Sequence, residues 1–170
     1  MLGFYEGFPT NVHKTVVFTT LVSSKRLQEQ IIKLFHELNK KVFSLEDVAV
    51  PSTPQCTVIF EFGIAETNNF NYLDDEEAEK TLKAIRKKPL QIMDIFCAIR
   101  YYKKVQDEKK RPLRFDYYML RFLFNKNTVE MLVLHERGPR YVSPEEIITF
   151  LASKINEAFS KKVLKSLETS

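Results

Sequence analysis

Positively charged and aromatic side chains are interleaved over residues 100–126. This stretch holds nine basic and three acidic residues, so its local net charge is +6, while the whole chain carries +4. Basic side chains bind phosphates and aromatic rings stack on bases, so the mixture indicates contact with nucleic acid. The alternative is a solvated loop with half-buried tyrosines, because charge runs usually face water. The residues concerned are Arg100, Lys103, Lys104, Lys109, Lys110, Arg111, Arg114, Arg121 and Lys126, with Tyr101, Tyr102, Tyr117 and Tyr118.

A second, smaller basic cluster precedes the last predicted helix. Arg137 and Arg140 flank a Gly-Pro pair, and Tyr141 follows them. The free backbone N–H groups at the start of the next helix favour an anion nearby. We therefore add Arg137 and Arg140 to the predicted RNA-binding residues. Within the first cluster, Arg114 and Arg121 are the predicted phosphate contacts, and residues 109–111 form a basic finger.

Motifs for catalysis or cofactor binding do not occur in the sequence. The four glycines are too far apart for a dinucleotide or phosphate-binding loop, so we expect no nucleotide cofactor. The three histidines have no second His or Cys at zinc-site spacing. His135 and Glu136 are adjacent on a predicted strand and therefore point to opposite faces. The four acids at 74–77 fit the positive end of a helix dipole better than a metal site. We expect a non-enzymatic protein.

Bulk properties indicate one globular domain. The chain has 170 residues, 44% hydrophobic and 28% charged, which is ordinary for a folded domain. Cys56 and Cys97 lie in apolar stretches and read as buried reduced thiols rather than a disulfide framework. No signal peptide or membrane-length apolar run is recognisable, so we expect a cytoplasmic protein with no membrane association. We place the ordered core at about 10–160 and expect residues 161–170 to fray.

Hydrophobic spacing predicts alternating strands and helices. Residues 12–22, 58–65, 113–124 and 128–136 read as strands, with a hairpin connection at 125–127. Helices are expected from 24 to about 40, after Asp74, and after Ser143, where Ser143, Pro144 and Glu146 match a capping box. Residues 90–105 fit either type, and we favour a helix. These elements predict an α+β fold, in which a mixed or antiparallel sheet of four or more strands carries helices mainly on one face.

Both faces of the predicted strand at 113–124 carry bulky side chains. Leu120, Phe122 and Phe124 lie on one face, and Phe115, Tyr117, Met119 and Leu123 lie on the other. Such a strand is central in its sheet or is covered on its second face by a partner. A symmetric homodimer would supply that cover.

The order of elements resembles an archaeal family described as predicted exosome subunits or RNA-binding proteins. The resemblance rests on residues 16–38, on residues 118–125 with Arg121 in the family's arginine–phenylalanine strand position, and on residues 140–143. It implies a fold similar to the ribosomal protein that binds 5S RNA. The loop at Ser52–Gln55 departs from the Glu/His/Gly-rich loop of that family, so an RNA contact made there would be altered.

Two functional hypotheses follow from different classes. The first is a non-catalytic RNA-binding module, associated with RNA processing or degradation, that uses the two basic clusters. The second is a protein–protein assembly module, a homodimer with no nucleic-acid role. A contiguous basic patch in the folded molecule favours RNA binding, whereas basic side chains scattered over the surface argue against it.

Overall fold

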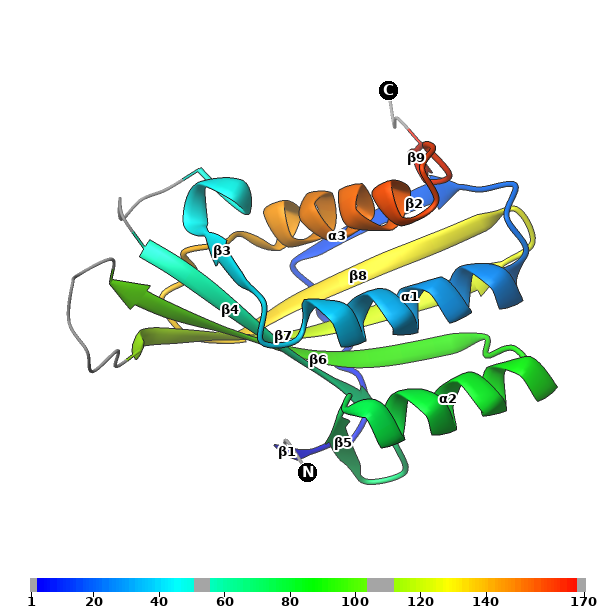
Figure 1. Cartoon of the computed structure of the whole chain (residues 1–170), viewed down its shortest axis with the longest axis horizontal. Helices are drawn as coiled ribbons and strands as arrows, with labels where there is room; N and C mark the ends of the chain where they lie inside the picture. The colour runs from blue at the N-terminus through cyan, green and yellow to red at the C-terminus, as the bar shows by residue number, and fades with distance from the viewer. Residues whose placement is uncertain (1–2, 51–55, 104–111, 168–170) are drawn as a thin grey trace.

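The computed structural model describes residues 3–50, 56–103 and 112–167. In these ranges nine strands pair antiparallel in one sheet, and three α-helices lie on one of its faces (Figure 1). The expected α+β class with helices on one face is therefore confirmed. The elements are β1 (Gly3–Phe4), β2 (Lys14–Thr19), α1 (Ser24–Leu38), β3 (Val42–Ser44), the 3₁₀ helix η1 (Leu45–Asp47), β4 (Cys56–Ala65), β5 (Asn69–Tyr72), α2 (Asp75–Lys87), β6 (Ile92–Lys103), β7 (Pro112–Asn125), β8 (Thr128–Arg137), α3 (Pro144–Ala158) and β9 (Lys165–Ser166).

The sheet has the strand order β1-β5-β4-β6-β7-β8-β2-β9, and β3 pairs with β4. Strands β6, β7 and β8 lie in the middle and follow one another along the chain, so β7 is a central strand, which is one of the two alternatives expected for it. The β7–β8 turn falls at the predicted hairpin, and Asn127 adopts the left-handed conformation with φ 65°. Asn tolerates this conformation better than most residues because its side chain is short and polar.

Side-chain caps start each of the three α-helices of the described residues. Ser23 accepts a hydrogen bond from the backbone of Arg26 at 3.3 Å, and Asp74 accepts one from Glu77 at 2.8 Å. At α3 the full capping box forms, because Ser143 and Glu146 each accept the other's backbone N–H, at 3.1 and 2.9 Å. The predicted helix starts are therefore confirmed, and each satisfies N–H groups that would otherwise lack a partner.

The hydrophobic core lies between the helices and the inner face of the sheet. Alternate residues of β6, such as Ile95, Cys97 and Ile99, point inward and are fully buried. Phe35 of α1 stacks on Phe62 of β4 with ring centroids 4.5 Å apart. Replacing a phenylalanine buried to this extent by alanine typically costs about 3–5 kcal/mol of folding free energy. Both cysteines are buried and free, as expected.

The helix favoured for residues 90–105 is wrong, because Ile92–Lys103 form strand β6. Helical spacing is present in Ile92, Phe96 and Ile99, but in the strand Ile92 and Phe96 lie on one face of the sheet and Ile99 lies on the other. Pairing with β4 and β7 on both sides overrides the local pattern, since it satisfies the backbone groups of the whole segment.

At the end of the chain, where fraying is expected over 161–170, residues 161–167 lie against the sheet, and residues 168–170 lie outside the described residues. Val163 and Leu164 are buried, at 6% and 2% exposure. Strand β9 pairs with β2 through Thr19↔Lys165 and Phe18↔Ser166. Two apolar side chains thus fix a short segment that reads as charged in sequence.

The face of the sheet opposite the helices, called the outer face below, is crossed by residues 5–13 on the way from β1 to β2 (Figure 1). The Tyr5 hydroxyl donates a hydrogen bond to Asp94, and Arg121 lies over the Phe8 ring at 4.5 Å. Part of the second face of β7 is therefore covered by the chain's own N-terminal segment. Among the described residues, no helix combines the length and apolarity that crossing a bilayer requires.

Candidate nucleic-acid interface

Antiparallel pairing of β7 and β8 brings the two basic clusters together. Tyr117 lies opposite Arg137, and the Arg137 guanidinium carbon is 4.8 Å from the centroid of the Tyr117 ring. On the other side, β6 places Arg100 opposite Phe115, with the guanidinium 5.8 Å from that ring. A cation over an aromatic face is attracted by the ring's quadrupole. Two arginines are thus held against two rings on the outer face.

A hollow of about 610 Å³ opens at this end of the sheet. Two arginines, two aromatic rings and a Gly-Pro turn line it, and none of its described lining residues is acidic. The side chains combine charge for a phosphate with rings for a base, which is the pairing that single-stranded nucleic acids require. The lining residues are Arg114, Phe115, Tyr117, Arg137, Gly138 and Pro139. We call this set the arginine–aromatic hollow.

A row of aromatic rings continues from the hollow across the outer face. Tyr117 contacts Phe96 of β6 at 5.7 Å between centroids, and Phe96 contacts Phe70 of β5 at 5.4 Å. Tyr5 meets Phe70 edge-on at 4.9 Å. At the other end, Phe115 and Tyr117 have nearly parallel rings, inclined by 7°. The N-terminal segment covers the far end of the row at Phe70, which is buried, while Phe115 and Tyr117 are only half-buried.

A β-bulge in the β7–β8 pair aims Arg137 at the hollow. The register shifts between Tyr117 and Tyr118, which pair with Arg137 and His135, so Glu136 is the additional residue. Without it, Arg137 would share a face with His135 and would point toward the helices. Tyr118 and His135 do point inward, with ring centroids 5.1 Å apart. The bulge therefore puts a positive charge on the ring of Tyr117.

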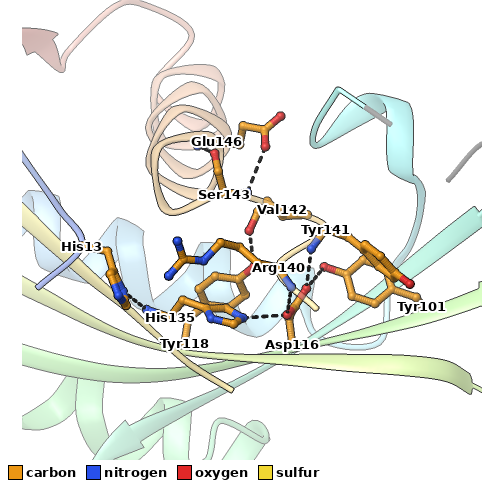
Figure 2. Close-up of polar contacts among 10 residues, drawn as sticks. All are labelled: His13, Tyr101, Asp116, Tyr118, His135, Arg140, Tyr141, Val142, Ser143 and Glu146. Carbon is orange, nitrogen blue, oxygen red and sulfur yellow. Dashed lines mark hydrogen bonds and ion pairs between the residues drawn. The ribbon is translucent and has the colours of Figure 1, made fainter. Parts of the chain in front are cut away.

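Asp116 stands between Phe115 and Tyr117 in β7, but its side chain points to the inner face and is fully buried. Its carboxylate organises the loop that closes the hollow (Figure 2). Its Oδ1 accepts the backbone N–H of Arg140 at 2.7 Å and lies 2.7 Å from Nε2 of His135. Its Oδ2 accepts the Tyr101 hydroxyl at 2.6 Å and the backbone N–H of Tyr141 at 3.0 Å. Four donors occupy the four acceptor positions of a carboxylate. Asp116 thus has a positioning role.

The loop approaches β7 so closely that only glycine fits at position 138. Gly138 has φ 118°, and a Cβ atom there would lie 2.2 Å from the backbone oxygen of Phe115 and 2.5 Å from Oδ1 of Asp116. Arg140 is also left-handed, with φ 60°, which turns its N–H toward Asp116. The Tyr118 hydroxyl donates to the carbonyl of Val142, which secures the other end of the loop. Strained backbone persists only when its surroundings fix it in this way.

Burial keeps the two tyrosines of this network neutral. Burial, the neighbouring Tyr118 and the Asp116 carboxylate raise the pKa of Tyr101 far above its ordinary value of 10.0. Burial and Asp116 raise the pKa of Tyr118 in the same direction. Removing the ring hydroxyl from water disfavours the phenolate, and a nearby carboxylate disfavours it further. Both hydroxyls therefore remain hydrogen-bond donors throughout the neutral range.

The structure separates the predicted RNA-binding residues into four groups. Arg114 and Arg137 line the hollow. Arg100, Lys103 and Arg140 lie at the same end of the sheet, and Arg100 also pairs with Glu61 at 2.8 Å. Arg121 and Lys126 lie elsewhere. Lys104, Lys109, Lys110 and Arg111 lie outside the described residues, as does the Ser52–Gln55 loop.

Two of these residues are poor candidates for a phosphate contact. Arg121 forms a two-pronged ion pair with Asp94, at 2.7 and 2.8 Å, and only 25% of its side chain is exposed. Lys126 is in the β7–β8 turn, at the opposite end of β7 from Arg114. Tyr101 and Tyr118 are buried on the inner face and do not present their rings for stacking.

Sequence reasoning missed Asp116 as an organising residue and Phe96 as a ring of the outer face. Phe96 fell in the segment predicted to be helical, although alternation of Met93, Ile95 and Cys97 with the intervening residues was a usable signal. His135 has a carboxylate partner, but it is Asp116 from the neighbouring strand and not the adjacent Glu136.

Within the described ranges there is no group of three or more His, Cys, Asp or Glu that could hold a metal ion. Compared with protein-family models, with curated proteins and with solved structures, the chain has no match in any of the three.

Proposed function

We propose that this protein binds single-stranded RNA, without catalysis, at the arginine–aromatic hollow. The observation that carries the proposal is the meeting of Arg114 and Arg137 with the rings of Phe115 and Tyr117 in one hollow whose lining contains no acidic residue. Guanidinium groups are suited to bidentate phosphate contacts, and a half-buried ring on a sheet surface gives a base a stacking platform.

A single strand fits the outer face better than a duplex does. Sequence-specific RNA recognition commonly places unstacked bases on aromatic side chains of an antiparallel sheet backed by helices, and the same layers occur here. This comparison concerns architecture alone. The rigid backing of β6, β7 and β8, together with the Asp116 network, fixes the rings and arginines before any ligand arrives, which lowers the entropy cost of binding.

The proposal extends to the archaeal exosome-associated RNA-binding family and the 5S-RNA-binding fold that the sequence resembles. The sequence stretches at 16–38, 118–125 and 140–143 and the strand–helix order they encode support this extension. The cytoplasmic location belongs to the same proposal.

Fluorescence anisotropy with end-labelled RNA tests the function. We expect a 12-nucleotide single strand of mixed sequence to bind at 50 mM salt, and a hairpin duplex of equal length to bind more weakly. Affinity should fall as salt rises, with a slope set by the number of phosphates neutralised. Absence of binding at low salt, or preference for the duplex, would contradict the proposal.

A homodimer through the outer face is the second candidate. One observation favours it: Ile92 is 47% exposed opposite Leu123 of β7, on the part of the outer face away from the hollow. Light scattering over a concentration series distinguishes a dimer from a monomer, and Ile92→Asp should return a dimer to monomers. RNA binding at the hollow is compatible with either state.

A further inference from the structure

At the opposite end of the sheet from the hollow, basic side chains surround a larger cavity of about 810 Å³. Its lining includes the end of β2, the start of α1, the β7–β8 turn and the segment that follows α3. Four basic residues line it, and none of its described lining residues is acidic. Arg26 comes from α1, and Lys161, Lys162 and Lys165 come from the segment that follows α3.

The three lysines stand on a backbone that is fixed in place. The Asn156 side chain accepts the backbone N–H groups of Val163 and Leu164 at 2.9 and 2.8 Å, and both of these residues are buried. Lys165 belongs to β9, and its carbonyl accepts the Thr19 hydroxyl at 3.3 Å. The backbone that carries the three lysines is therefore fixed, so their side chains extend from defined positions around the cavity.

Arg26 is positioned independently of the lysines. Its guanidinium lies 5.3 Å from the centroid of the Phe159 ring at the end of α3, which favours a side-chain orientation across the α1–α3 gap. Among the ion pairs of the described residues, none involves Arg26, Lys161, Lys162 or Lys165. Four like charges around one cavity repel one another, and a multiply charged anion relieves that repulsion.

The remaining lining favours a small ligand with an organic part. Hydroxyl groups of Thr20, Ser23 and Thr128 supply further polar contacts, while Val22 and Val163 give apolar surface. The volume falls within the range of pockets for small molecules and cofactors. The cations converge on a cavity instead of forming a stripe, whereas a polynucleotide backbone requires a track of charge along its length.

We propose that this cavity binds a small organic phosphate, with its phosphate groups among Arg26, Lys161, Lys162 and Lys165. The site is separate from the arginine–aromatic hollow, so it holds or fails independently of RNA binding. The ligand class is a phosphate or diphosphate ester whose organic part rests on the Val22 and Val163 side.

Amide chemical shifts from ¹H–¹⁵N spectra of the intact chain test the site, with inorganic pyrophosphate and adenosine 5′-diphosphate as probes. We expect saturable shifts at Ser23, Thr128 and Lys165, with tighter binding of the diphosphate ester because it also covers apolar surface. Lys161→Ala/Lys165→Ala should weaken binding of both probes about tenfold. Lys33→Ala, an exposed charge on α1 outside the lining, should leave it unchanged.

Each contrary outcome overturns a defined part of the proposal. Shifts that do not saturate, or equal weakening by Lys33→Ala, would show only diffuse charge attraction. Equal affinity for pyrophosphate and adenosine 5′-diphosphate would show that the cavity does not contact the organic part of the ligand. Displacement of pyrophosphate by single-stranded RNA would assign the cavity to a polynucleotide. Circular dichroism checks the fold of the double variant, which we expect to be retained because Val163 and Leu164 are unchanged in it.

Discussion

The guanidinium carbon of Arg137 lies 4.8 Å from the centroid of the Tyr117 ring. The contact joins β8 to β7 on the outer face, and it exists because a bulge at Glu136 reverses the direction of the side chains that follow. Charge and ring are held together at the mouth of a hollow.

Tyr117→Ala should weaken binding of a 12-nucleotide single-stranded RNA by about 1–3 kcal/mol, the usual value of one base stacked on an aromatic side chain. Tyr117→Phe keeps the ring and should bind almost as the parent does. Anisotropy titrations at one salt concentration measure both. Equal losses in the two variants would assign the effect to the hydroxyl group and contradict stacking.

Asp116→Ala should lower the free energy of unfolding by about 3–5 kcal/mol, because it removes a buried charge that four donors surround. Urea denaturation measures the loss. Asp75→Ala, which removes a carboxylate that is 97% exposed in its ion pair with His36, is the matched control and should have little effect. A small loss for Asp116→Ala would mean that the loop is held by other contacts.

Comparing the unfolding free energies of Gly138→Ala and Gly7→Ala distinguishes the cost of backbone strain from the cost of a steric clash. Both glycines have positive φ, 118° and 125°, but nothing lies within 4 Å of a Cβ at Gly7, whereas the Phe115 oxygen would lie 2.2 Å from one at Gly138. We expect Gly7→Ala to cost about 1–2 kcal/mol of unfolding free energy from strain. Gly138→Ala should cost at least about 2 kcal/mol more and should also weaken RNA binding. Similar costs would show that the loop moves away freely.

Stability should decline in alkali because of the two buried tyrosines. The pKa values of Tyr101 and Tyr118 are raised in the folded protein, so above pH 10.0 the unfolded chain loses protons that the folded chain keeps. Their contribution to stability is complete below that pH and is lost above it, with a slope of up to about 2.7 kcal/mol per pH unit. Urea denaturation between pH 8 and 11 measures it, and Tyr101→Phe should lower the slope by up to about 1.4 kcal/mol per pH unit. A flat profile above pH 10 would contradict the burial of these hydroxyls.

Local signals in the sequence were enough for much of the fold. Ser143, Pro144 and Glu146 predict the start of α3 because a capping box depends on neighbours within one turn. The alternation along β4 and the turn at Asn127 are equally local. The predicted helix at 90–105 is wrong because Phe96 is an apolar residue on the outer face, where it belongs to the row of rings between Phe70 and Tyr117. Together with Ile92 and Ile99 it produces the spacing of a helix.

The sequence predicted which types of residue form the candidate site, but not which of them lie together. The excess of arginine and tyrosine at 100–126 pointed to the right region, but which side chains meet depends on strand register. Asp116 looked like one acid among many bases, and its partners come from β6, β8 and the loop after Gly138. Arg121 looked like a phosphate contact, yet Asp94 of the neighbouring strand neutralises it. Such partners are set by tertiary pairing, and no local pattern encodes them.

Two arginines of the hollow provide the decisive comparison. The double variant Arg114→Ala/Arg137→Ala removes both arginines from the lining and leaves the Asp116 network intact. The references are the parent chain and Lys126→Ala, whose lysine lies at the far end of β7. If each arginine contacts one phosphate, the slope of log affinity against log salt for single-stranded RNA should fall by about 1.4 in the double variant. Lys126→Ala should leave that slope unchanged.

The most direct test of RNA binding at the hollow is therefore this salt series, from 50 to 200 mM, on three proteins side by side: the parent chain, Arg114→Ala/Arg137→Ala and Lys126→Ala. The account predicts a shallower slope and weaker binding for the double variant alone. An unchanged slope for Arg114→Ala/Arg137→Ala, or an equal change for Lys126→Ala, would contradict it.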